Sequence, residues 1–117
     1  MLTDPTARRR VATAAIVLSL VVAAFENRAL LKESAHAAAG ERTVERLDRG
    51  ELRVASPTDT VDDHGMRVWT THAWIKQAIL LYFGLRPSEA IQAGDVSFFD
   101  KVPTKRADAS HGVRIVP

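Results

Sequence analysis

Few residues of this chain are of a type and spacing that could carry out chemistry. The serines lack a GxSxG nucleophile elbow, and no glycine-rich phosphate loop is present. Asp59, Asp62 and Asp63 form a small acidic group, but a calcium loop also needs a glycine at position 6 and a terminal glutamate. No two histidines have metal-ligand spacing or form an HExxH pair. We therefore expect no metal site and no self-contained catalytic set. The histidines are His36, His64, His72 and His111.

The C-terminal quarter of the chain is cationic. Arg114 is its most interesting member, because a guanidinium can hold a carboxylate through two parallel hydrogen bonds. The alternative is ordinary surface charge, paired weakly with Asp100 and Asp108. From the residues alone, both a small anionic-ligand site and solvated surface charge stay open. The cations of this segment are Lys101, Lys105, Arg106 and Arg114.

Length and composition predict a single folded domain that is stabilised by packing. The chain has 117 residues, of which 46% are hydrophobic. Its 16 basic and 14 acidic residues are scattered, so nothing in the charge requires nucleic acid. Cysteine is absent, which excludes a disulfide framework, a thiolate metal site and a cysteine nucleophile.

The stretch 68–85, VWTTHAWIKQAILLYFGL, is predicted to be the central helix. Its apolar residues recur with a period of about 3.6. Thr70 or Thr71 is expected to cap its first turn, and Gly84 and Pro87 are expected to end it. We expect this helix to form the centre of the core by burying Trp74, Ile75, Ile79 and Phe83.

The N-terminal region has two interpretations. Residues 1–10 form a flexible basic lead that includes the run Arg8 to Arg10, and the apolar run Val11 to Phe25 follows. The first interpretation is a packed helix. The alternative is export or membrane anchoring through Val11 to Phe25, although a transmembrane helix needs about 20 apolar residues.

Shorter elements surround the central helix. Helical composition continues over 26–32 and resumes over 41–48, with 35–40 as a connection and Gly50 as a stop. Residues 51–55 alternate as a strand that Pro57 closes, and 66–70 can pair with it in a loose hairpin. After the helix, Pro87 begins a turn or short helix. Residues 96–100 then bring two aromatic side chains against the core.

Four ordered motifs resemble one protein family. LDRGELRVA (47–55), WTTHAWIKQAILLYF (69–83), FFDKVPTK (98–105) and VRIVP (113–117) are similar to the N-terminal domain of tetrahydrodipicolinate N-succinyltransferase. AFENRA (24–29) resembles the first helix of that domain. The resemblance covers most of residues 24–117. It implies an α+β, mainly helical fold over 11–117, a small helical bundle with a β-hairpin, which in the family precedes a left-handed parallel β-helix.

The resemblance also implies an activity. The family transfers a succinyl group from succinyl-CoA to the amino group of an opened cyclic dicarboxylate in bacterial lysine and diaminopimelate biosynthesis, and its members are cytoplasmic homotrimers. Its β-helix supplies the coenzyme A groove and the acidic catalytic residue. We therefore expect that this chain, which stops at Pro117, binds no cofactor, holds no catalytic residue and is incomplete as an enzyme.

Individual residues take their expected roles from the same motifs. Arg114 matches the substrate-binding arginine of the family by its position in VRIVP. Trp74, Asp100, Lys101 and Pro103 match positions expected to be structural. The alternative function is a non-catalytic derivative of this domain that acts as a protein-interaction module.

Overall fold

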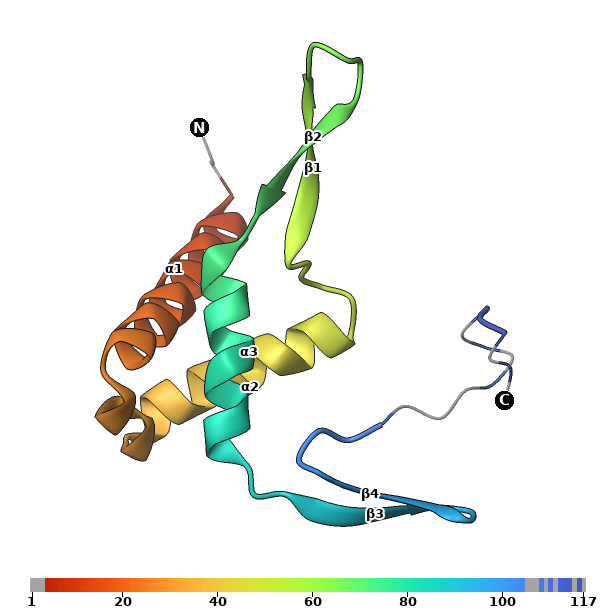
Figure 1. Ribbon diagram of the computed structural model, residues 1–117. Coiled ribbons are helices and arrows are strands. Elements are labelled where there is room, and N and C mark those ends of the chain that lie inside the picture. The colour runs from red at the N-terminus through yellow and green to blue at the C-terminus, as the bar shows by residue number, and fades with distance from the viewer. Residues whose placement is uncertain (1–3, 105–107, 109, 111, 115, 117) are drawn as a thin grey trace. The chain divides into compact units, whose positions relative to one another are not determined.

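The computed structural model describes residues 4–104, 108, 110, 112–114 and 116. The chain divides into two compact units, residues 1–86 and 87–117. The first unit contains the helices and one hairpin, and the second contains another hairpin (Figure 1). In chain order the elements are α1 (Pro5–Glu26), the 3₁₀ helix η1 (Arg28–Lys32), α2 (Ser34–Asp48), β1 (Ala55–Val61), β2 (Arg67–Thr71), α3 (Ala73–Leu85), β3 (Glu89–Ala93) and β4 (Val96–Asp100). The predicted α+β, mainly helical class is confirmed.

Helix α1 begins earlier than expected, at Pro5 instead of Val11. Asp4 caps it, because its Oδ1 accepts a hydrogen bond of 2.9 Å from the backbone N–H of Thr6, and proline suits the first helical position. Part of the predicted flexible lead is therefore helical. No helix in the described part of the chain combines the length and apolar character that crossing a bilayer requires.

Helix α2 begins at Ser34, so the alanine-rich segment 35–40 is helical and the predicted connection is wrong. Alanine is the strongest helix former, and small residues also allow close packing. At Gly40 an added Cβ would lie 3.5 Å from Leu85 Cδ1 of α3. The predicted stop at Gly50 is confirmed, since this residue has φ +74° and its N–H donates to the Leu47 carbonyl at 3.0 Å.

The predicted hairpin is confirmed with other bounds, since its first strand is β1 (Ala55–Val61) and not 51–55, and β2 takes up the predicted start of the central helix. Thr70 and Thr71 lie in β2, and α3 begins only after His72, whose side chain makes no capping hydrogen bond. β1 pairs antiparallel with β2, and Pro57, expected to close a strand, lies within β1 opposite Trp69. Proline is tolerated because a two-stranded sheet has two free edges. Strand pairing thus overrides the helical period before residue 73.

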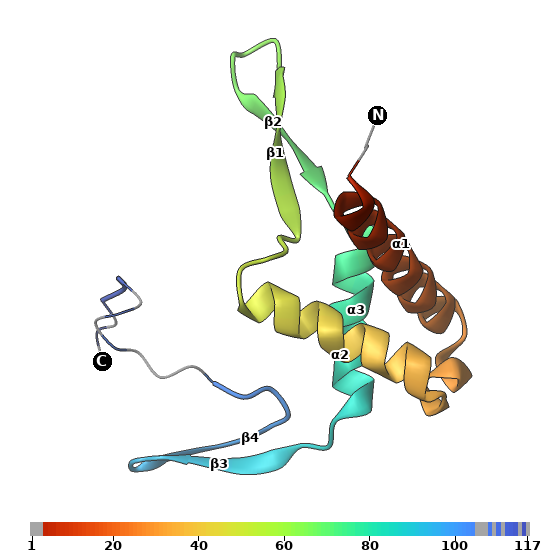
Figure 2. The same ribbon diagram turned by 180° about the vertical axis from the view of Figure 1, so that it is seen from behind.

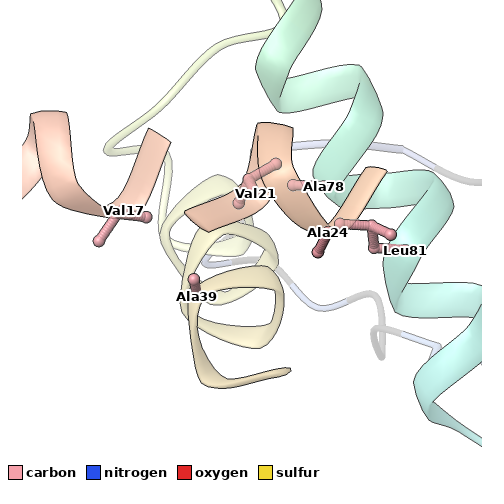
Figure 3. Packing of buried hydrophobic residues seen from close by; sticks show 6 residues of the cluster. All are labelled: Val17, Val21, Ala24, Ala39, Ala78 and Leu81. Atoms are coloured by element: carbon pink, nitrogen blue, oxygen red, sulfur yellow. The ribbon is translucent and has the colours of Figure 1, made fainter. Parts of the chain in front are cut away.

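The core lies where α1, α2 and α3 meet, and α2 crosses α3 in both views of the ribbon (Figures 1 and 2). Thr43 is also buried there, and its hydroxyl donates to the Ala39 carbonyl at 2.8 Å. Burial of Ile75 is confirmed, but Trp74 and Ile79 are half-buried and Phe83 is exposed. The buried cluster in Figure 3 consists of Val17, Val21, Ala24, Ala39, Ala78 and Leu81.

The second unit is built on the antiparallel hairpin of β3 and β4. The register pairs Glu89 with Asp100 and Ala93 with Val96, so two residues make the turn, and Gly94 has φ +64°. Such a two-residue turn favours a positive φ. The turn or short helix expected after Pro87 is therefore wrong, because β3 begins at Glu89. The expected packing of Phe98 and Phe99 against a core is also wrong, because both side chains are exposed.

Candidate functional site

Arg114, the predicted substrate-binding residue, lies in irregular backbone of the second unit and is exposed. Lys105 and Arg106 of the predicted cationic segment lie outside the described residues. The backbone N–H of Lys101 donates to Asp100 Oδ1 at 2.7 Å. Arg114 is therefore open to solvent, where its guanidinium can reach an anion.

Asp108 has a local hydrogen-bonding role in the same segment. The hydroxyl and the backbone N–H of Ser110 both donate to its Oδ1, at 2.5 and 2.8 Å. The hydroxyl of Ser110 and then its N–H lower the pKa of the Asp108 carboxyl below its usual value, because both bonds favour the charged form. Asp108 is thus ionised at neutral pH and is held by Ser110.

Of the predicted structural residues, Trp74 belongs to the first unit and the other three to the second. Trp74 is half-buried and packs against the core cluster. Asp100 is the last residue of β4, and Lys101 and Pro103 follow it. A hollow of about 280 Å³ lies beside Asp100, lined by Ile91, Phe98, Phe99, Asp100, Val102 and Thr104. Apart from Asp100 and Thr104 its lining is apolar, so its chemistry favours an apolar contact over anion binding.

The described histidines have local roles. His36 Nδ1 lies 3.0 Å from Glu33 Oε2 at the start of α2. Asp62 caps the turn between β1 and β2, because its Oδ1 accepts from the backbone N–H groups of His64 and Met66. In the part of the chain that the structure describes, no group of three or more histidine, aspartate and glutamate side chains could hold a metal ion. His111 lies outside the described residues.

One polar pair was missed in the sequence. His72 Nε2 lies 3.0 Å from Ser56 Oγ, across 16 residues, beside a groove of about 530 Å³. A serine nucleophile needs its histidine oriented by a third group. Among the described residues no carboxylate pairs with His72. The pair therefore joins β1 to the start of α3, and only the hairpin register brings the two residues together.

The helical unit with its first hairpin agrees with the small helical bundle and β-hairpin that the sequence resemblance implies, and the C-terminal hairpin of β3 and β4 is an addition that the motifs did not predict. A sequence model of the tetrahydrodipicolinate N-succinyltransferase N-terminal family matches residues 17–85, more than half of the chain. The chain belongs to this family. The matched segment includes Trp74 and stops before Asp100, Lys101, Pro103 and Arg114.

Several curated relatives carry the name of the same enzyme family. A 2,3,4,5-tetrahydropyridine-2,6-dicarboxylate N-succinyltransferase from Paracidovorax citrulli (strain AAC00-1) is 43% identical over 109 residues, covering 85% of this chain and 38% of the relative. The protein of the same name from Variovorax paradoxus (strain S110) is 44% identical over 108 residues, covering 84% and 37%. That from Azoarcus sp. (strain BH72) is 43% identical over 104 residues, covering 80% and 36%. The chain therefore spans less than two fifths of the length of these relatives.

Proposed function

We propose that this chain is the N-terminal, substrate-binding portion of a tetrahydrodipicolinate N-succinyltransferase. The observation that carries the proposal is the family match over residues 17–85, supported by 43% identity to a named N-succinyltransferase over 85% of the chain. The reaction is succinyl transfer from succinyl-CoA to the amino group of an opened cyclic dicarboxylate, in lysine and diaminopimelate biosynthesis in the cytoplasm. The assembly is the homotrimer that the sequence resemblance implies.

In this proposal Arg114 supplies a contact to the dicarboxylate. Its side chain is exposed, and a guanidinium fork fits a carboxylate through two charge-assisted hydrogen bonds. In this proposal the described residues contribute neither the acyl-donor site nor the catalytic acid or base. The sequence resemblance assigns those functions to the β-helix that follows this domain in the family.

The test uses the 117-residue chain, labelled with ¹⁵N and titrated with pyridine-2,6-dicarboxylate as a stable cyclic dicarboxylate. We expect saturable amide shifts around Arg114 that disappear in Arg114→Gln. Arg67→Gln is the matched control, because it removes the same charge from an exposed position on β2. Unchanged shifts in Arg114→Gln would overturn the role of Arg114.

An activity assay tests the division of labour. We expect the chain to show no turnover with succinyl-CoA and the amino acceptor. Turnover that disappears in Arg114→Ala would contradict the proposal that the catalytic groups lie elsewhere.

A second candidate function is a protein-interaction module, and the exposed aromatic side chains of β4 favour it. Phe99 is 76% exposed and Phe98 is 52% exposed. Adjacent residues of a strand point to opposite faces, so both faces of this hairpin carry an exposed ring. An isolated two-stranded hairpin is marginally stable in water, so a covering surface would stabilise it.

Sedimentation of the chain alone and mixed with a full-length relative tests this second function. A complex that forms with the wild type and is lost in Phe99→Ser supports the interaction module. Thr104→Ser, a conservative change in the same unit, should leave the complex intact. Monomeric behaviour in every mixture would exclude this function for the tested relative.

A further inference from the structure

A groove of about 610 Å³ between α1 and α2 gathers positive charge in the first unit. Three of the residues that line it are arginines, Arg10 from α1 and Arg42 and Arg46 from α2. Its other polar side chains are Thr6, Thr13 and Glu51, and Ala14 and Val17 give it an apolar wall. None of the predicted site residues lines it.

Helical periodicity explains how the groove is built. On α1, Thr6, Arg10 and Thr13 are spaced four and three residues apart and therefore share one face. On α2, Arg42 and Arg46 are four residues apart and share the face that meets it. Like charges at this spacing repel each other and destabilise a helix. A bound anion would remove that repulsion.

The carboxylate of the groove does not neutralise its charge. Glu51 Oε2 lies 3.1 Å from Arg46 Nε, and Glu51 Oε1 lies 2.8 Å from Arg49 Nε. Hydrogen bonds from Arg46 and Arg49 lower the pKa of Glu51, so this carboxylate is charged at neutral pH and already engaged. Among the described residues, Arg10 and Arg42 have no carboxylate partner. Two guanidinium groups are therefore left to face an anion.

We propose that this groove binds a small organic phosphate. The phosphate group would lie between Arg10 and Arg42, because several guanidinium N–H groups can donate to its three oxygen atoms and its charge near −2 matches the two cations. The apolar body of the ligand would lie against Ala14 and Val17. This site goes beyond the proposed succinyltransferase role and does not depend on it.

The test is an amide-shift titration of the full 117-residue chain with butyl phosphate, inorganic phosphate and succinate, at constant ionic strength. We expect saturable shifts at residues 10, 13, 42 and 46, with butyl phosphate tighter than inorganic phosphate because of the apolar wall. The double variant Arg10→Gln/Arg42→Gln should weaken butyl phosphate binding by about tenfold or more, as expected for the loss of charge-assisted bonds. Arg67→Gln, a charge-matched control outside the groove, should bind like the wild type.

Three results would overturn the proposal. The first is shifts that rise linearly with every anion, which would mean screening only. The second is tighter binding of succinate than of butyl phosphate, which would assign the groove to dicarboxylates. The third is unchanged binding in the double variant while its circular dichroism spectrum matches the wild type. If the double variant unfolds, Arg42→Lys provides the folded test, because it keeps the charge, loses the planar fork and should bind more weakly. Pyridine-2,6-dicarboxylate shifts near Arg114 should persist in the double variant, which separates this site from the proposed substrate site.

Discussion

Replacing Leu81 with alanine should destabilise the first unit more than any other single leucine truncation on α3. Leu81 is 0% exposed and lies at the junction of the three helices with Val21, Ala24 and Ala78 (Figure 3). Leu→Ala removes buried carbon atoms worth about 0.8 kcal/mol per CH₂ and leaves a cavity. Its neighbours are small side chains on rigid helices, which can collapse only partly into the space. We expect a loss of about 3–4 kcal/mol in the free energy of unfolding.

The neighbouring residue provides the matched control. Leu80 has the same side chain on the same helix but is 51% exposed, so Leu80→Ala should cost less than about 1 kcal/mol. Urea unfolding followed by circular dichroism at 222 nm measures both variants, and the slope with urea should stay unchanged. Equal losses in the two variants would refute the packing of α1, α2 and α3 described above.

Three further predictions concern the first unit. The arginine partners of Glu51 lower its pKa below the usual 4.5, so its ion pairs stabilise the fold above that pH and are lost as the pH falls through the lowered pKa. The urea midpoint should therefore fall more steeply between about pH 6 and pH 3 in the wild type than in Glu51→Gln. Equal slopes in the two proteins would contradict this prediction. Gly50→Ala should lower the free energy of unfolding by about 1 kcal/mol, because Gly50 has φ +74°. Gly84→Ala should raise it by about 0.5–1 kcal/mol, because Gly84 is helical and an added Cβ would make only an ordinary contact with Leu31. Thermal melts distinguish the two signs. Trp74 is half-buried and Trp69 is 57% exposed. The variant Trp69→Phe, which keeps only Trp74, should therefore emit at shorter wavelength and resist iodide quenching better than Trp74→Phe, which keeps only Trp69. The reverse order would contradict the burial of the two rings described above.

Local sequence signals predicted the elements that depend on neighbouring residues. The apolar period after residue 73 correctly predicted α3. Gly50 correctly predicted the end of α2, because that position needs a residue that tolerates a positive φ. The motifs also predicted the family, and the match over residues 17–85 confirms it. Arg114 as a substrate ligand stays a prediction.

Long-range pairing decided the features that the sequence left open or assigned wrongly. The sequence placed residues 68–70 both in the central helix and in a hairpin, and they form a strand because β1 pairs with them across a turn. Phe98 and Phe99 are of a residue type that usually packs in a core, but both are exposed because two strands alone have no buried face. The Ser56–His72 contact and the arginine groove join residues 16 or more apart, and no local pattern encodes such distances. The sequence by itself therefore determined the family, the helix after residue 73 and the end of α2, since periodicity and motifs are local, whereas tertiary packing decided which side chains meet.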